Sequence, residues 1–169
     1  KAVVLLSGGL DSTTVLAIAQ DQGYLCHCLS FRYGQRQEIE LTRAKAICAR
    51  FQIAQHLVLQ VGLDTIGGSA LTGSFEVPKD RVVSQRKDDI PVTYVPGRNI
   101  IFLSYALSWA EVLGATDIFL GINAIDYSGY PDCRPEFLDA FAAMAKLGTK
   151  MGTQGDDIRF HAPLVHLSK

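Results

Sequence analysis

Short apolar runs alternate along this chain with longer segments whose apolar residues recur every three or four positions. The run at 2–6 (AVVLL) has no polar side chain, as expected of a parallel strand covered on both faces. Over 36–52, Leu41, Ala44 and Cys48 fall on one face of a helix. The pattern predicts strands at 2–6, 24–31, 55–61, 115–122 and 158–163, and helices at 12–22, 36–52, 99–113 and 135–147.

The alternation of strand and helix predicts an α/β fold. A doubly wound, mostly parallel five-stranded sheet with helices on both faces fits it best. The 169 residues suit one domain, so we expect a single domain over 1–169. The segment 62–91 interrupts the pattern, first with Gly and Thr and then with charged residues, which is typical of a lid or a disordered insertion. Ligands of such sheets bind beyond the carboxyl ends of the strands, so the loops there are the candidates for function.

Composition and charge narrow the class of protein. Apolar residues make up 48% of the chain, and 16 basic and 17 acidic residues give a net charge of −1, so no direct nucleic-acid partner is expected. No apolar run approaches a membrane span, and Ser7 ends the first run too early for a signal peptide. The four cysteines include no C-x-x-C pair, and we expect Cys26 and Cys28 to be buried small side chains. A cytoplasmic protein is the expectation.

The first loop, SGGLDS at 7–12, has the parts of a phosphate-binding cradle. Gly8 and Gly9 allow close backbone approach, and the following helix adds unpaired N–H groups and the positive end of its dipole. Neither the Walker pattern nor the dinucleotide fingerprint is present. Asp11 either helps to hold Mg²⁺ or caps the helix. The alternative is an ordinary Gly/Ser turn before a well-capped helix.

Two further loops follow predicted strands or precede a predicted helix. FRYGQR at 31–36 offers Tyr33 and Gln35 as candidates to line a nucleotide site. TYVPGRN at 93–99 places Arg98 and Asn99 at the start of an apolar helix. An arginine there can pair in bidentate fashion with a phosphate or a carboxylate, and a surface salt bridge is the alternative.

The loop at 121–137 is crowded with polar and aromatic side chains. Two acids, two tyrosines, a serine and an arginine fall between Asp126 and Arg134. Aromatic faces beside carboxylates suit a flat, nitrogen-rich ring, which stacks on tyrosine and donates from its N–H edges. A loop that turns on Gly129 and Pro131 also explains part of this composition.

These motifs carry a resemblance to a known family. SGGLDS resembles the loop of the PP-loop ATP pyrophosphatases, which grips the β- and γ-phosphates of ATP and leaves the α-phosphorus open to attack. SGGLDSTT, YGQR, VPGRN and DYSGYPDCR, in that order, resemble the 7-cyano-7-deazaguanine synthase family of queuosine biosynthesis. The resemblance runs from residue 2 to the end of the chain and is loosest over 62–91.

The resemblance implies an ATP-dependent ligase that converts 7-carboxy-7-deazaguanine and ammonia to the nitrile through an acyl-adenylate and an amide. It implies a cytoplasmic homodimer that uses ATP and Mg²⁺, the latter with Asp11. Arg98 or Arg134 would hold the substrate carboxylate, and Asp126 or Asp132 with Tyr130 would read the base. Ser7, Asp11, Ser12 and Arg98 are the catalytic candidates. The ATP-binding candidates are Leu6, Ser7, Gly8, Gly9, Leu10, Asp11, Ser12, Thr13, Tyr33, Gln35 and Lys169, and the substrate-binding candidates are Arg98, Asn99, Asp126, Ser128, Tyr130, Asp132 and Arg134.

Two points remain open from the sequence. Members of that family carry four zinc-binding cysteines near the C-terminus, which this chain lacks, and Cys133 is too isolated to replace them. Zn²⁺ is therefore expected only in a full-length protein, and we expect a truncated chain, with a reduced relative as the alternative. Lys169 is either near the ATP phosphates or a tail lysine. The other functional readings are a tRNA-thiolating or amidating PP-loop enzyme and a non-catalytic ATP-binding module.

Overall fold

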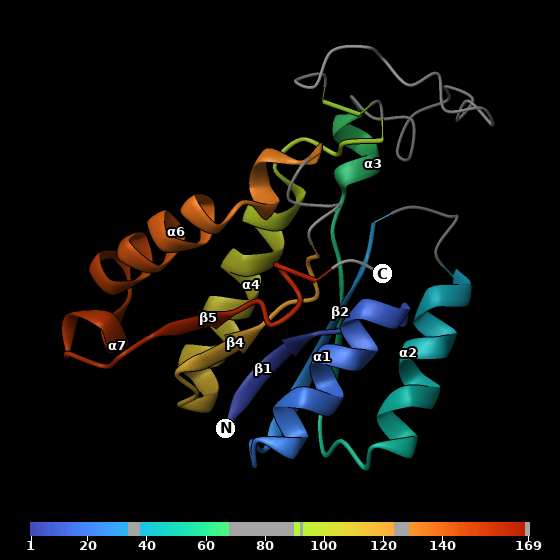
Figure 1. Cartoon of the computed structure of the whole chain (residues 1–169), viewed down its shortest axis with the longest axis horizontal. Helices are drawn as coiled ribbons and strands as arrows, with labels where there is room; N and C mark the ends of the chain where they lie inside the picture. Colours follow the sequence, from blue (N-terminus) through green and yellow to red (C-terminus); the bar gives the residue numbers. More distant parts are fainter. Residues whose placement is uncertain (34–37, 68–89, 92, 124–128, 168–169) are drawn as a thin grey trace.

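The computed structural model describes residues 1–33, 38–67, 90–91, 93–123 and 129–167. Its centre is one five-stranded sheet in the order β3-β2-β1-β4-β5, and every strand pairs in parallel with its neighbours (Figure 1). The doubly wound α/β fold is thereby confirmed, with a sheet that is entirely parallel over these strands. The strands are β1 (Ala2–Leu5), β2 (Cys26–Arg32), β3 (His56–Gln60), β4 (Asp117–Phe119) and β5 (Arg159–His161).

Helices cover both faces of the sheet, as predicted (Figure 1). One buried core joins α1 and α2 to one face, and a second core joins α4 and α6 to the other. Within the described ranges, no helix combines the length and the apolar character needed to cross a lipid bilayer. The helices are α1 (Leu10–Asp21), α2 (Glu38–Arg50), α3 (Leu63–Ile66), α4 (Arg98–Leu113), the 3₁₀ turn η2 (Pro131–Cys133), α6 (Pro135–Gly148) and α7 (Lys150–Thr153).

Strand β1 shows why its sequence has no polar face. Val3 belongs to the core under α4 and α6, whereas Ala2 and Val4 belong to the core under α1 and α2. Successive side chains of a strand point to opposite faces, so a central strand covered on both sides needs an apolar residue at every position.

Several element boundaries differ from the predictions. Strand β4 ends at Phe119, not at 122, because its partner strand β5 ends at His161, opposite Phe119. Leu120 and Ile122 continue as buried core residues that also line a cavity. Helix α1 begins at Leu10, two residues before the predicted start. The short elements α3, η2 and α7 were not predicted, since three or four residues carry no measurable periodicity. Most of the predicted lid or insertion at 62–91 lies outside the described residues.

All four cysteines are buried and carry free thiols, so the prediction for Cys26 and Cys28 is confirmed. Burial raises the pKa of Cys26 to about 11, and burial also raises the pKa values of Cys28 and Cys48. Because the thiolate is the reactive form, these three side chains act as apolar filling of the core.

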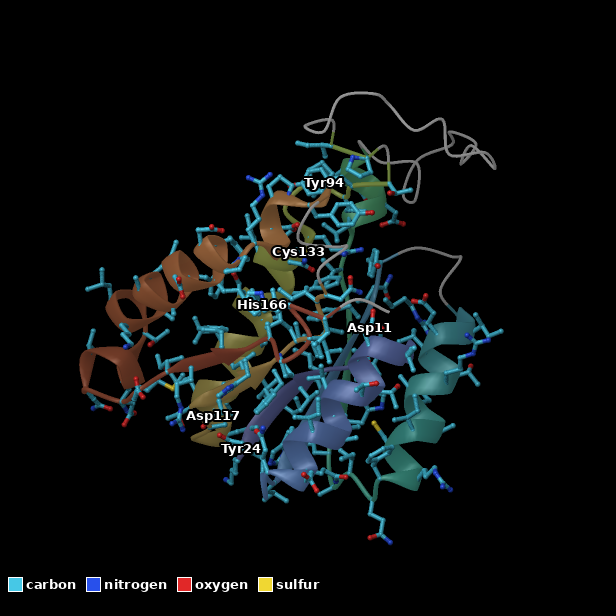
Figure 2. All side chains as sticks on the ribbon, viewed as in Figure 1. Asp11, Tyr24, Tyr94, Asp117, Cys133 and His166 are labelled. Atoms are coloured by element: carbon cyan, nitrogen blue, oxygen red, sulfur yellow. The ribbon has the colours of Figure 1, made fainter. Side chains whose placement is uncertain are left out.

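A buried carboxylate fastens the edge strand β5 to β4 at the amino ends of the strands, opposite the loops of interest (Figure 2). Asp117 is 3% exposed and accepts hydrogen bonds from Tyr24, Thr116, Arg159 and His161. Burial alone would raise the pKa of Asp117, but the hydrogen bonds, that from Arg159 foremost, hold the pKa below its ordinary value. A depressed carboxyl pKa means that the charged form stabilises the fold.

We expect Asp117→Asn to lower the free energy of unfolding at pH 7 by about 2 kcal/mol, the scale of hydrogen bonds to a charged group. Because the folded-state pKa is depressed, this contribution is complete above the unfolded pKa of about 4 and is lost as the pH falls through the folded value. Urea unfolding of both proteins from pH 7 down to pH 2.5 measures it. The difference in the free energy of unfolding between the two proteins should become smaller below about pH 4. A difference that does not change with pH would contradict the role of the charge.

Candidate active site

The functional loops converge at the carboxyl ends of β1, β2 and β4. The chain leaves β1 toward β2 on one side and reaches β4 on the other, so the β1–β4 gap is the switch point where doubly wound sheets bind ligands. A cavity of about 270 Å³ opens there, close to the smaller sizes of ligand pockets. Its walls include Ser7 and Ser12 from the first loop, Phe31 and Tyr33 from the end of β2, and Arg98 from α4.

The first loop depends on a glycine that packs against a neighbouring helix. Gly8 has a φ of +85°, in the left-handed region. A Cβ atom there would lie 2.4 Å from the carbonyl oxygen of Glu40 and 2.9 Å from the amide nitrogen of Ala44, both in the backbone of α2. The loop therefore rests directly on α2. Its amides and the first-turn N–H groups of α1 form a set of donors suited to phosphate.

The hydroxyl groups of this loop bond to the loop itself. Ser12 Oγ accepts from the Ser7 amide at 3.2 Å and donates to the Gly9 carbonyl at 3.1 Å. The Ser7 and Ser12 hydroxyls lie 3.0 Å apart, and Thr13 Oγ1 donates to the Gly9 carbonyl at 2.7 Å. Ser7 Oγ also accepts from the Gly9 amide at 3.2 Å. These bonds fix the shape of the turn and engage the amides of Ser7 and Gly9 within it. The candidate donors to a phosphate are therefore the remaining amides of the loop and of the first turn of α1.

Asp11 does not cap the helix, so that alternative from the sequence is wrong. Helix α1 starts at Leu10, its N-cap is Gly9, and Asp11 stands in the first turn. Its Oδ2 accepts from Asn123 Nδ2 at 2.9 Å. Within the described part of the chain, no three carboxyl, histidine or cysteine groups gather to hold a metal. A single carboxylate fits Mg²⁺, which is commonly held by one or two carboxylates together with substrate phosphates.

Strand β4 continues into a segment that braces the first loop. A Cβ atom on Gly121 would lie 2.8 Å from the Ser12 amide nitrogen and 3.0 Å from the Asp11 carbonyl carbon. Sequence reasoning missed both Gly121 and Asn123. The signal was weak: a glycine and an asparagine directly after an apolar run.

A second brace comes from β2. Ser30, which is 2% exposed, donates its hydroxyl to the Leu6 carbonyl at 2.5 Å, one residue before the loop begins. The Ser30 hydroxyl also bonds to His56 Nε2 at 2.7 Å. Burial, and then Lys45, lower the pKa of His56. A lone serine within CHCLSF was the only sequence signal for this contact.

Arg98 is the positive group of the cavity. It is half-buried, and its side chain hydrogen-bonds to Tyr33. Burial alone would lower the pKa of Arg98, but Tyr33, Asp132 and Cys133 raise it above its ordinary value, so the guanidinium stays charged. Among the described residues, no Asp or Glu forms an ion pair with Arg98. The surface salt bridge considered from the sequence is thus not found in this part of the chain.

Asn99 and Asp132 bind each other. The Asn99 amide nitrogen donates to Asp132 Oδ2 at 2.9 Å, and Asn99 Nδ2 donates to the Asp132 carbonyl at 3.1 Å and to Cys133 Sγ at 3.0 Å. Asp132 is 4% exposed, and its carboxylate stands at the N-terminus of α4, where a negative charge is favourable. These two candidates therefore support the start of α4, which carries Arg98.

Two tyrosines near the start of α4 stack on each other. The rings of Tyr94 and Tyr130 are 6.1 Å apart and inclined by 23°. The Tyr130 hydroxyl lies 2.9 Å from Thr93 Oγ1, and Tyr94 accepts from the Gly97 amide at 3.2 Å. Figure 2 shows Tyr94 beyond Cys133 at this end of the molecule. Tyr94 was not a sequence candidate.

The side chains of the remaining candidates make no specific polar contact described above, or they lie outside the described residues. Leu6 is a buried wall of the cavity, and Leu10 is 73% exposed at the start of α1. Arg134 is exposed and directly precedes α6. Four candidates fall outside the described residues, so their positions stay predictions: Gln35, Asp126, Ser128 and Lys169.

The fold is similar to that of a solved structure. That protein is a predicted subunit of a tRNA methyltransferase from Methanocaldococcus jannaschii. The TM-score is 0.59 at 15% identity, and the match covers 99% of this chain and 69% of that one. At this identity the likeness concerns the fold alone.

Sequence relatives are far more similar. Proteins named 7-cyano-7-deazaguanine synthase from Solidesulfovibrio magneticus, Kineococcus radiotolerans and Geobacter metallireducens are 59%, 57% and 58% identical to this chain. The matches cover 100%, 99% and 100% of this chain and 72%, 73% and 70% of those proteins. A family model described as queuosine biosynthesis protein QueC matches residues 1–169. With the loop, the cavity and Arg98 in the arrangement described, this chain is an enzyme that belongs to the QueC family of queuosine biosynthesis proteins.

Proposed function

We propose that this enzyme converts 7-carboxy-7-deazaguanine, ammonia and ATP to 7-cyano-7-deazaguanine. The observation that carries the proposal is the placement of Arg98, a charged side chain without an acidic partner in the described chain, in the same cavity as the first loop. The first loop is suited to the phosphates of ATP and Arg98 to a carboxylate. Bringing two such anions together is the main task of an adenylating enzyme.

In the proposed reaction, the first loop holds the β- and γ-phosphates and Arg98 holds the substrate carboxylate. A carboxylate is ionised at neutral pH and is already a nucleophile, so no general base is required for its attack on the α-phosphorus. The P–O bond to the leaving group breaks, and pyrophosphate departs while the loop amides stabilise its developing charge. Mg²⁺ held beside Asp11 would neutralise part of the phosphate charge. The product of this step is the acyl-adenylate.

Ammonia then attacks the acyl carbon, and the C–O bond to AMP breaks to give the amide. A second ATP is attacked by the amide oxygen with loss of pyrophosphate. Loss of AMP and of the remaining N–H proton then forms the nitrile. Each adenylation uses the same donors and the same guanidinium, so one site serves both steps.

For the base, we propose the aromatic faces of Tyr130 and its neighbour Tyr94, with Asp126 and Ser128 on its polar edge as the family resemblance implies. Asp132 and Asn99 are engaged with each other, which supports a role for them in orienting the start of α4. Tyr33, Gln35 and Lys169 remain the proposed neighbours of ATP. The segment 62–91 remains the proposed lid or insertion of a single domain.

Three further features of the enzyme belong to the proposal. The four free cysteines suit a reducing, cytoplasmic environment. Zn²⁺ would need cysteines beyond these 169 residues, since no three cysteine, histidine or carboxyl groups gather as ligands among the described residues. A homodimer is supported by exposed apolar side chains seven positions apart on α4, Tyr105 at 43% and Val112 at 80%. Size-exclusion chromatography with light scattering tests the dimer.

The direct test is to incubate the enzyme with ATP, Mg²⁺, ammonium and 7-carboxy-7-deazaguanine and to follow nucleotides and base by mass spectrometry. We expect AMP and the cyano base to form together, and both to be lost in Ser7→Ala and Asp11→Ala. AMP without any change in the base would indicate another acceptor, such as a tRNA. Binding of ATP with no turnover would favour the non-catalytic module.

A further inference from the structure

Asn123 holds the carboxylate of Asp11 from across the molecule. Its Nδ2 donates to Asp11 Oδ2 at 2.9 Å, although the two residues are 112 positions apart in the sequence. Asn123 is 3% exposed, so its amide is almost fully withdrawn from water. A buried polar side chain is costly unless it is bonded, and here the bond is made to a residue of the phosphate-binding loop.

The backbone near Asn123 touches the same part of the loop. Two residues earlier, Gly121 approaches the loop so closely that a Cβ atom would lie 2.8 Å from the Ser12 amide nitrogen. The segment that follows β4 is thus in contact with the start of α1 through both its backbone, at Gly121, and the Asn123 side chain. Both contacts lie at the β1–β4 switch point, which is where the ligand is proposed to bind.

The chemistry of the contact suits a metal-binding carboxylate. An amide N–H orients a carboxylate through one of its lone pairs and leaves the negative charge in place. An arginine or lysine in the same position would offset that charge and compete with a cation. Groups that orient the ligands of a metal in this way commonly change metal affinity or activity by 10- to 100-fold when they are removed.

We propose that Asn123 is a positioning residue that orients the Asp11 carboxylate toward the magnesium ion carried by ATP. The proposal rests on the proposed function, because it takes the first loop as the site of Mg-ATP. Asn123 does not touch the reacting atoms in this role. It acts through Asp11, and Gly121 keeps the two segments at the required separation.

The test compares ATP binding with and without Mg²⁺, measured by isothermal titration calorimetry. For the wild type we expect tighter binding in Mg²⁺ than in EDTA. For Asn123→Ala, which removes the donor without adding a charge, we expect the affinity in Mg²⁺ to fall about tenfold and that in EDTA to be little changed. Asn123→Leu provides a second uncharged variant of nearly the same size as asparagine.

A double-mutant cycle shows whether the effect passes through Asp11. In an Asp11→Ala background, Asn123→Ala should cause no further loss of Mg²⁺-dependent affinity. Additive losses, or an unchanged gain from Mg²⁺ in both Asn123 variants, would overturn the proposal. The KM for 7-carboxy-7-deazaguanine should stay within about twofold of the wild-type value, since a ground-state contact that is left intact does not change it. Thermal unfolding of each variant identifies any loss of the fold.

Failure of this proposal and failure of the proposed function have different signatures. If wild-type enzyme makes no cyano base but binds ATP with a gain from Mg²⁺ that Asn123→Ala removes, the proposed function is wrong and the role of Asn123 stands. If the wild type makes the cyano base and the Asn123 variants keep the full gain from Mg²⁺, the role of Asn123 is wrong.

Discussion

Replacing Arg98 by methionine should lower kcat/KM for 7-carboxy-7-deazaguanine by about 100-fold or more, the scale found when a preorganised electrostatic group is removed from an active site. Methionine has a similar length and leaves little void. The free energy of unfolding should change by less than about 1 kcal/mol, because Arg98 is half-buried and has no ion-pair partner among the described residues, so its charge contributes little net stability. Steady-state AMP formation at saturating ATP, with the acid varied, measures the first effect, and urea unfolding measures the second.

Arg134 is the matched control for this prediction, since the sequence offered it as the alternative partner of the carboxylate. It is exposed and precedes α6, so Arg134→Met should change kcat/KM by less than about threefold, as surface substitutions usually do. Arg98→Lys keeps the charge but loses the planar fork, and its activity should fall between those of Arg98→Met and the wild type. A larger loss in Arg134→Met than in Arg98→Met would contradict the assignment.

The KM for ATP separates two roles of Arg98. If Arg98 holds the substrate carboxylate, the KM for ATP should stay close to the wild-type value in Arg98→Met. If Arg98 instead holds the α-phosphate, the KM for ATP should rise with the loss of activity.

The fold was predictable because its signals are local. The apolar run of β1 and the helical spacing of α2 are read within a single segment, and alternation of such segments leaves few sheet topologies. The same reasoning overextended β4: Leu120 and Ile122 are buried core residues that also line the cavity beyond the strand, and a single sequence does not distinguish such positions from membership of a strand.

The site was predictable only where a motif marks it. The first loop and Arg98 stand at strand or helix ends and were found, whereas Asn123 and Ser30 were missed. Their importance lies in single contacts with Asp11 and Leu6 that join distant parts of the chain, and neither contact leaves a periodic pattern. For Asp132 the residue type correctly indicated a functional region, but the sequence did not reveal which group its carboxylate binds. A carboxylate in a polar loop can face a substrate or a helix N-terminus, and its Oδ2 here bonds to the start of α4.

The contact between the first loop and α2 predicts a large effect on both stability and activity when Gly8 is replaced. Gly8→Ala should lower the free energy of unfolding by about 3 kcal/mol, from about 1 kcal/mol for an alanine in the left-handed region and about 2 kcal/mol for overpacking. The overpacking is severe because the atoms that a Cβ would meet, the Glu40 carbonyl oxygen and the Ala44 amide nitrogen, belong to helix backbone and cannot rotate away. Gly8→Ala should also displace the loop amides by about 1 Å, and this displacement should lower kcat/KM for ATP by about 100-fold.

Gly23 separates the two causes. Its φ of +83° is nearly the same as that of Gly8, but no atom lies within 4 Å of its Cβ position. Gly23→Ala should therefore cost only the backbone part, about 1 kcal/mol, and leave kcat/KM for ATP unchanged. Urea unfolding and steady-state kinetics of both variants measure these effects. Equal losses of stability in Gly8→Ala and Gly23→Ala would mean that position 8 requires glycine only because of its left-handed conformation. A stability difference of about 2 kcal/mol, accompanied by loss of ATP use only in Gly8→Ala, would mean that contact with α2 sets the shape of the loop.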